Sequence, residues 1–317
     1  MKNLSEKFAC IFPGQGSQSV GMMDGYADFP IVRETFAEAS DILGEDFWAM
    51  VHDGPADKLN LTINTQPLML MAGVAVYRAW NTLGNVKPVF MAGHSLGEYT
   101  ALVASGALAF GDALPLVRFR GEVMQQAVPE GTGAMAAILG LDDEVVQAIC
   151  DEITNSSDGE LLEPANFNSP GQVVVAGHRN AVLRGMELAK VKGAKLAMML
   201  PVSIPSHCSL MRQAAERMRK RLERVTLGVP EISLLHNADV RQHEDPEDIK
   251  QILIQQLFSP VRWTEIIRFF SGVGITHMVE CGPGKILSGL NKRISKNLQS
   301  IALTDGAAIR NAGNILI

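Results

Sequence analysis

The chain has 317 residues, of which 47% are hydrophobic and 20% charged, and its formal net charge is −6. These values are ordinary for a globular protein with a sizeable core, and the length allows one large domain or a core with an insertion. The negative balance disfavours nucleic acid and anionic membranes as partners. The first seven residues lack the apolar region of a secretion signal, and the longest apolar stretch, 68–77, is too short to span a bilayer. We therefore expect a cytoplasmic protein.

Four cysteines are spread along the chain without a C-x-x-C pair: Cys10, Cys150, Cys208 and Cys281. This spacing indicates reduced, partly buried thiols in a cytosolic protein, and metal binding is the disfavoured alternative. Nucleotide loops of the G-x-G-x-x-G and G-x-x-x-x-G-K-[ST] types are absent, and the turn at 282–285 does not qualify as the second. We expect neither a metal nor a cofactor.

The N-terminal part alternates strands and helices. Residues 8–12 predict a strand that leads into a glycine-rich turn, 13–18, and helical patterns follow at 31–43 and 67–83. Pro67 would lie in the first turn of the second helix, where its missing N–H costs nothing. An apolar run at 89–92 predicts another strand, residues 98–104 and 111–128 predict helices, and residues 129–133 read as a break.

The next segment has the order strand, helix, strand, strand, helix, strand, which is that of a ferredoxin-like unit. Its expected elements are 134–140, 142–154, 164–168, 172–176, 180–192 and 194–200. The α/β pattern then resumes, with strands at 233–236 and 277–281 and a helix at 286–295. We therefore expect a parallel-sheet core, 1–129 and 201–317, with a ferredoxin-like subdomain inserted at 130–200.

Residues 93–97 read GHSLG between the expected strand and helix, which is the context of a nucleophile elbow. The glycines permit a sharp turn and leave room for a substrate against the backbone. Ser95 is then exposed beside the N-terminus of a helix, where amide donors can stabilise an oxyanion. This pattern predicts acyl transfer or hydrolysis.

A serine hydroxyl needs a base within hydrogen-bond reach, and His207 is the best candidate. It lies in the segment PVSIPSHC at 201–208, where two prolines restrict the backbone. The alternative is a loop histidine that satisfies a backbone group. His94 adjoins Ser95 but should point elsewhere, and the remaining weak candidates are His52, His236 and His277.

Arg120 is an independent clue. On a helical wheel of residues 111–128 it falls near the middle of an apolar stripe formed by Ala113, Leu116, Val117, Met124 and Ala127. A guanidinium there is costly unless an anion pairs with it. The anion could be an interior Asp or Glu, in a structural salt bridge, or a carboxylate on the substrate.

Three other segments are ambiguous. The turn at 14–16 could bring backbone N–H groups to a reacting carbonyl, or could simply join a strand to a helix. The polar stretch at 166–172 is typical of a hairpin. The run 212–224 carries six basic residues against two acidic ones, which fits a solvated helix face or a docking site for an acidic partner.

As a set, these segments resemble the malonyl-CoA:acyl carrier protein transacylases of bacterial type II fatty-acid synthesis, in order, from about residue 8 to 303. The segments that carry the resemblance are 12–18 (FPGQGSQ), 93–99 (GHSLGEY), 120–121 (RG), 166–172 (NFNSPGQ), 205–207 (PSH), 256–263 (QLFSPVRW) and 282–284 (GPG).

The resemblance implies a hydrolase-like α/β core with a ferredoxin-like insertion. It makes Ser95 the nucleophile and His207 the general base and acid. It assigns the oxyanion hole to the backbone N–H groups of Gln15 and Leu96, and the malonyl carboxylate to Arg120. It also implies that the backbone carbonyl of Gln256 orients the histidine without a triad acid. Together with Arg120, Gln256 and Asn168 are expected to bind the substrate.

The implied reaction is ping-pong transfer of malonyl from malonyl-CoA, through a malonyl-serine ester, to the phosphopantetheine thiol of holo acyl carrier protein. Arg120 would then explain selectivity for malonyl over acetyl, because a neutral substrate leaves a buried cation unpaired. We expect a monomer.

Three rival functions remain. One is an acyltransferase of the same family in polyketide synthesis, although residues 204–206 before His207 and Leu96 after Ser95 look more like the fatty-acid enzymes. Another is a serine hydrolase or lipase, which predicts a triad acid and leaves Arg120 unexplained. The third is an idle carrier-binding protein, against which the intact Ser95, His207 and Arg120 argue.

Overall fold

The structure is a computed structural model that describes residues 7–84, 86–202 and 204–316. The expectation about a secretion signal rests on residues 1–7, of which 1–6 lie outside the described part. At the centre is a parallel sheet with the strand order β7-β2-β1-β8-β9. Its strands are β1 (Phe8–Phe12), β2 (Phe90–Gly93), β7 (Ser233–Leu235), β8 (His277–Glu280) and β9 (Gln299–Ala302).

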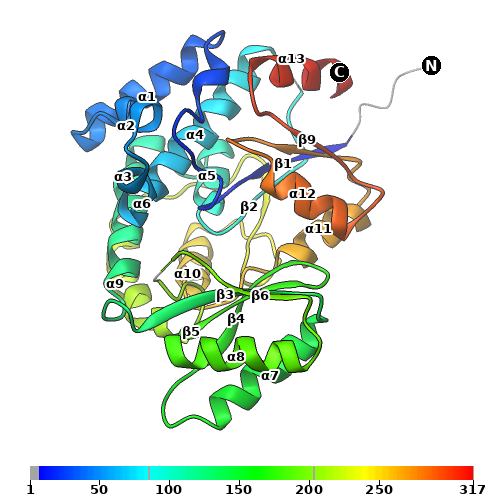
Figure 1. The fold of residues 1–317 in the computed structure, drawn as a ribbon. Helices are drawn as coiled ribbons and strands as arrows, with labels where there is room; N and C mark the ends of the chain where they lie inside the picture. The colour runs from blue at the N-terminus through cyan, green and yellow to red at the C-terminus, as the bar shows by residue number, and fades with distance from the viewer. Residues whose placement is uncertain (1–6, 85, 203, 317) are drawn as a thin grey trace.

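Helices cover both faces of this sheet (Figure 1). On β1, Phe8, Cys10 and Phe12 belong to one apolar cluster, whereas Ala9 and Ile11 belong to another. Burial on both faces explains why the strand is a continuous apolar run. The helices of this core are α1 (Pro30–Leu43), α2 (Phe47–Asp53), α3 (Ala56–Asn60), α4 (Thr62–Thr82), α5 (Gly97–Ala104), α6 (Phe110–Gln125), α9 (Arg212–Leu222), α10 (Pro246–Gln256), α11 (Trp263–Gly272), α12 (Ile286–Ile294) and α13 (Gly306–Leu316). Two short 3₁₀ turns occupy Asp24–Tyr26 and Ser209–Met211.

A second, antiparallel sheet has the order β4-β5-β3-β6 and forms the lower lobe in Figure 1. Its elements are β3 (Gly133–Leu139), α7 (Asp143–Asn155), β4 (Leu162–Ser169), β5 (Gln172–His178), α8 (Arg179–Val191) and β6 (Leu196–Met199). The order along the chain is the predicted ferredoxin-like one, and α7 and α8 pack on one face. This confirms the predicted fold class, a parallel-sheet core with a ferredoxin-like insertion; the boundaries of the two domains stay a prediction.

The two lobes are joined by hydrogen bonds, two of them between main-chain atoms. Phe167 N donates to Val261 O at 2.9 Å, and Val261 N donates to Ala165 O at 2.9 Å. Thr264 Oγ1 donates to Phe167 O at 3.1 Å. Strand β4 of the insertion is thereby fixed against the segment that precedes α11.

One detail of the predicted elements is wrong. Helix α4 begins at Thr62, so Pro67 lies inside the helix and not in its first turn. Four of the five residues 62–66 are polar and hide this start in the hydrophobic pattern, yet all four are buried. No helix among the described residues combines the length and apolar character that a bilayer span requires.

Candidate active site

Ser95 lies on the sharp turn between β2 and α5, with a backbone φ of +52°. The two motif glycines make this turn possible. A Cβ on Gly93 would lie 1.8 Å from Gly97 C, and a Cβ on Gly97 would lie 2.0 Å from Phe12 O. Both contacts are with backbone, which cannot move aside as a side chain can. The G-x-S-x-G pattern is thus required by the close approach of the turn to itself and to the end of β1.

His207 reaches Ser95 from a loop far along the chain. Its Nε2 lies 2.7 Å from Ser95 Oγ, and its Nδ1 lies 2.8 Å from Gln256 O. Because a carbonyl only accepts, Nδ1 carries the hydrogen and Nε2 accepts from the serine hydroxyl. Burial, followed by the charge of Arg120, lowers the pKa of His207 to about 3. The imidazole is therefore neutral, as a general base must be, and no described carboxylate hydrogen-bonds to it.

Arg120 projects from α6 into the same site and is only 1% exposed. Its guanidinium donates to Gln66 Oε1 and Gln256 Oε1, both at 2.9 Å, and to Ser95 Oγ at 3.3 Å. Its Nε has no partner, and within the described ranges Arg120 forms no ion pair with an Asp or Glu. The partners are therefore neutral. Burial lowers the pKa of Arg120, but a guanidinium keeps its charge in proteins.

The turn at 14–16 packs directly against the elbow. A Cβ on Gly14 would lie 2.5 Å from His94 O and 3.6 Å from Leu96 N. No acceptor among the described residues is bonded to the backbone N–H of Gln15 or of Leu96. Two free amide donors thus border the serine from the two turns. The side chain of Gln15 donates to Thr62 Oγ1 at 3.4 Å.

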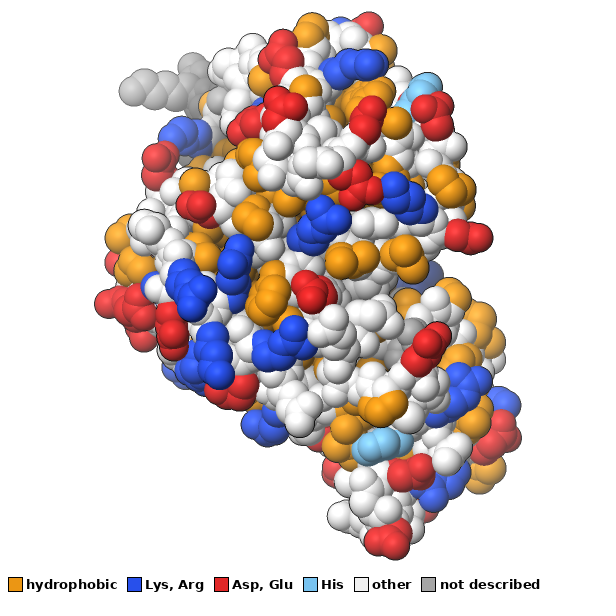
Figure 2. Space-filling view, turned by 90° about the vertical axis from the view of Figure 1, so that its left-hand side faces the viewer, with side chains coloured by type: hydrophobic (Ala, Val, Ile, Leu, Met, Phe, Trp, Pro, Cys, Tyr) orange, Lys and Arg blue, Asp and Glu red, His pale blue; other side chains and the backbone are white. Residues whose placement is uncertain are grey.

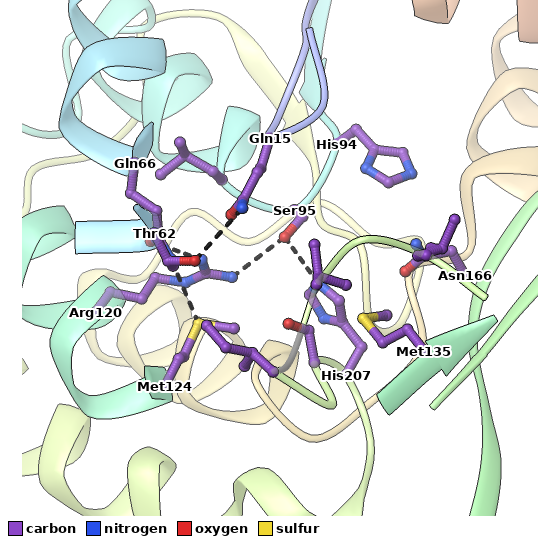
Figure 3. A pocket seen from close by; sticks show the side chains of 15 residues that line it. Gln15, Thr62, Gln66, His94, Ser95, Arg120, Met124, Met135, Asn166 and His207 are labelled. Carbon is purple, nitrogen blue, oxygen red and sulfur yellow. Dashed lines mark hydrogen bonds between the residues drawn. The ribbon is translucent and has the colours of Figure 1, made fainter. Parts of the chain in front are cut away.

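These groups surround a cavity of about 140 Å³. Figure 3 shows Ser95 between the side chains of Arg120 and His207, with Gln15 above them. The core supplies Ser95, His207 and Arg120, whereas the inserted lobe contributes Met135 and Asn166 to the lining. The four cysteines lie elsewhere in the interior and are free thiols, and the described residues contain no group of three or more His, Cys, Asp or Glu side chains arranged to hold a metal ion.

Asn168 lies behind the wall of the cavity. Its Oδ1 is 2.8 Å from His94 Nε2, and the cavity is lined by Asn166 in its place. His94 contributes its ring to the lining, away from the serine hydroxyl. The weaker histidine candidates lie elsewhere: His52 contacts Asp24, His236 contacts Glu98, and His277 is in β8.

Comparison with known proteins shows the family. An acyl transferase domain model matches residues 9–305. The malonyl CoA-acyl carrier protein transacylases of Salmonella typhimurium and Escherichia coli K12 are each 50% identical over 307 residues, covering 96% of this chain and 98% of theirs. The chain belongs to this family of transacylases.

Solved members of the family have the same fold. The transacylase from Coxiella burnetii superposes with a TM-score of 0.96 at 45% identity, covering 98% of both chains. A malonyl-transacylase in complex with a type II polyketide-synthase acyl carrier protein superposes with a TM-score of 0.96 at 47% identity, covering 98% of this chain and all of the other. The protein is thus an acyltransferase of the transacylase family.

Sequence reasoning missed three buried polar residues of this transacylase. Gln66 holds Arg120 from α4, and its signal is an amide directly before the long apolar run of that helix. Asn237 Oδ1 accepts from Ser95 N at 2.7 Å, from a loop that no local pattern marks. Glu98 was visible as part of the elbow motif, but nothing in the sequence shows what its carboxylate contacts.

Proposed function

We propose that this transacylase moves a malonyl group from malonyl-CoA to the phosphopantetheine thiol of holo acyl carrier protein, through a malonyl ester of Ser95. One observation carries the proposal. Ser95 Oγ lies 2.7 Å from a neutral histidine and 3.3 Å from a buried guanidinium whose partners are uncharged. An activated hydroxyl beside an unpaired cation suits an acyl group that ends in a carboxylate.

In the first half-reaction, His207 Nε2 takes the proton of Ser95 as the hydroxyl oxygen attacks the thioester carbonyl. The N–H groups of Gln15 and Leu96 stabilise the resulting oxyanion. The C–S bond then breaks, and the coenzyme A sulfur leaves with the proton held by His207. The product is the malonyl ester and a neutral imidazole.

In the second half-reaction, the carrier thiol gives its proton to His207 and attacks the ester carbonyl. Collapse of the tetrahedral intermediate returns the proton to Ser95 Oγ and leaves malonyl on the carrier. The Gln256 carbonyl accepts from His207 Nδ1 throughout, so it stabilises the imidazolium where a triad enzyme uses a carboxylate.

Arg120 gives the selectivity. A malonyl carboxylate would accept hydrogen bonds from the guanidinium, whereas an acetyl group would leave the charge without an anion. The lost charge-assisted hydrogen bonds correspond to about 1.5–3 kcal/mol. Asn168 would act indirectly, by fixing the His94 ring at the cavity wall.

The proposal includes a pathway and a setting. We infer a cytoplasmic monomer that supplies malonyl units for fatty-acid elongation. The names of the 50% identical relatives support the transfer itself, since they give malonyl CoA and acyl carrier protein as the two substrates. The polyketide alternative is supported by the 47% identical transacylase solved with a type II polyketide-synthase carrier. Transfer to purified carriers of the two types distinguishes them.

An intact-mass spectrum after brief mixing with malonyl-CoA tests the reaction. We expect one malonyl adduct on the wild type, none on Ser95→Ala, much less adduct with acetyl-CoA, and discharge when holo acyl carrier protein is added. Discharge by water alone would identify a hydrolase. An adduct on Ser95→Ala would refute Ser95 as the nucleophile.

A further inference from the structure

A buried carboxylate that has no role in the proposed reaction lies directly behind the site. Glu98, in the first turn of α5, has an exposed fraction of 0%. Its Oε1 lies 2.7 Å from His236 Nδ1. Its Oε2 accepts from Asn237 N and Gln256 Nε2, both at 3.0 Å. Burial of a carboxylate is costly unless it is well hydrogen-bonded, so this arrangement requires an explanation.

His236 contacts Glu98 through one side of its ring only. Its Nδ1 donates to Glu98, while its Nε2 is buried and has no hydrogen-bond partner among the described residues. The nearest cation in the hydrogen-bond network is Arg120, and the side-chain amide of Gln256 lies between the two charges.

The carboxylate determines which way this amide faces. Gln256 Oε1 accepts from Arg120 Nη2 at 2.9 Å, while Nε2 donates to Ser95 O at 2.9 Å and to Glu98. A reversed amide would place its N–H group against the guanidinium and its oxygen against both a carbonyl and a carboxylate. Glu98 therefore disfavours the reversed amide of Gln256. The partner that Arg120 keeps is then the neutral amide oxygen of Gln256, and not the carboxylate itself.

The same carboxylate also anchors the second amide that holds the serine. The backbone N of Asn237 donates to Glu98, its Oδ1 accepts from Ser95 N, and its Nδ2 donates to Gly93 O at 2.7 Å. Asn237 and Gln256 thus bind the N–H and the C=O of a residue with a strained, positive φ.

We propose that Glu98 is a positioning residue for this transfer, in that its carboxylate fixes Gln256 and Asn237, which hold Ser95 and Arg120 in place. The inference rests on the proposed function, since it concerns the preference for malonyl that Arg120 gives. It assigns no contact between Glu98 and the substrate.

The test is a double-mutant cycle between Glu98→Gln and Gln256→Ala, read as the ratio of malonyl to acetyl loading rates on Ser95. We expect Glu98→Gln to lower this ratio about tenfold or more in the wild-type background and by less than twofold in the Gln256→Ala background. The coupling arises because the carboxylate acts through the Gln256 amide. Glu98→Asp, which keeps the charge with a shorter reach, should give an intermediate ratio.

Glu280→Gln is the matched control. Glu280 is also a fully buried carboxylate of the core, but it accepts from the backbone N–H groups of Leu287 and Ser288 and is not among the described residues that line the cavity. This variant should lose thermal stability with an unchanged ratio. Equal ratios for Glu98→Gln and Glu280→Gln, or equal effects of Glu98→Gln in both backgrounds, would overturn the inference.

The experiment also distinguishes a folding defect of the variant from a failure of the proposed function. If Glu98→Gln does not fold, as shown by thermal unfolding, Glu98→Asp carries the test, and a wild-type ratio in that variant together with a wild-type loading rate counts against the inference. If the wild type itself forms no malonyl adduct, the proposed function fails before any variant is compared.

Discussion

The two lobes contribute to the site in different ways. The nucleophile, the base and the cation of the proposed chemistry all come from the parallel-sheet core, which supplies Ser95, His207 and Arg120. The inserted lobe supplies wall residues such as Met135 and Asn166. At the elbow that carries Ser95, backbone approaches backbone so closely that a single added Cβ would clash. We infer that the reacting groups depend on particular residues at particular positions. The residues that only line the cavity depend mainly on the fold of the inserted lobe.

The largest effect is expected at the turn that carries Ser95. Gly97→Ala would place a Cβ 2.0 Å from Phe12 O and 2.8 Å from Phe12 C, so β1 and α5 could not both keep their positions. We expect loss of malonyl loading and destabilisation of more than about 4 kcal/mol, measured by thermal or urea unfolding.

Gly289→Ala is the control for this substitution. Gly289 lies in α12, and a Cβ at this position would have nothing within 4 Å, so alanine there should stabilise the helix by up to about 1 kcal/mol. Similar stabilities for Gly97→Ala and Gly289→Ala would show that the elbow tolerates a Cβ, and that its glycines are not required for the turn.

The next largest effect concerns the guanidinium. Arg120→Ala should lower malonyl loading by about 10- to 100-fold and acetyl loading far less, because only malonyl offers the cation a carboxylate. Arg118→Ala, on the same helix, removes an arginine that pairs with Glu45 and should leave both rates near wild type. Equal losses of the two substrates in Arg120→Ala would remove Arg120 from specificity.

A pH profile sharpens the assignment of the base. The pKa of His207 is lowered from 6.5 to about 3, first by burial and then by Arg120, so the neutral base persists well below pH 6.5. We expect kcat/KM for malonyl loading to show no acid limb near pH 6.5, and Arg120→Ala to move the limb upward. A wild-type limb at pH 6.5 would contradict this assignment.

The same shift makes a prediction for stability. A base whose pKa is lower in the folded state binds its proton more readily when unfolded, so His207 reduces stability as the pH falls from about 6.5 toward 3. His207→Ala should therefore lose less of its melting temperature across that window than the wild type does.

The sequence predicted those parts of the site that a local pattern encodes. Ser95 follows from the elbow motif and Arg120 from its place on an apolar helix face. His207 was only a candidate until the fold placed it 2.7 Å from Ser95 Oγ, since 112 positions separate the two residues. The role of the Gln256 carbonyl came from family resemblance alone, because a backbone group has no residue-type signal. Gln66 and Asn237 were missed for a related reason: their hydrogen bonds exist only once distant elements pack together.

The fold was predicted well where hydrophobic period and turn residues agree, and less well at short or polar segments. The six elements of the insertion all appear, in the predicted order. Strand β9 was not predicted, since four residues at the sheet edge are half-buried and show no clear alternation. The start of α4 was misplaced because Thr62, Asn64 and Gln66 are buried by tertiary contacts and not by apolar character.

The smallest expected effect asks which lobe binds the carrier protein. Helix α9 of the core lies in the basic run 212–224, on the left of Figure 1. Figure 2 views the molecule from that side, and Lys and Arg side chains gather on the face it shows. Arg217 and Arg221 both lie 5.8 Å from the Phe119 ring, on the helix that carries Arg120, and neither forms an ion pair with a described carboxylate.

Reversing both charges, in Arg217→Glu with Arg221→Glu, should raise the KM for carrier protein about three- to tenfold, because exposed charges contribute only about 0.2–1 kcal/mol each. The KM for malonyl-CoA should not change. The matched control reverses Arg179 and Lys192, which flank or begin α8 on the inserted lobe. An increase confined to that control would place the carrier on the inserted lobe, and no increase in either would leave α9 a solvated helix face. An increase in this KM confined to the α9 variant would mean that the core binds the carrier protein and also supplies the reacting groups. The inserted lobe would then only line the cavity.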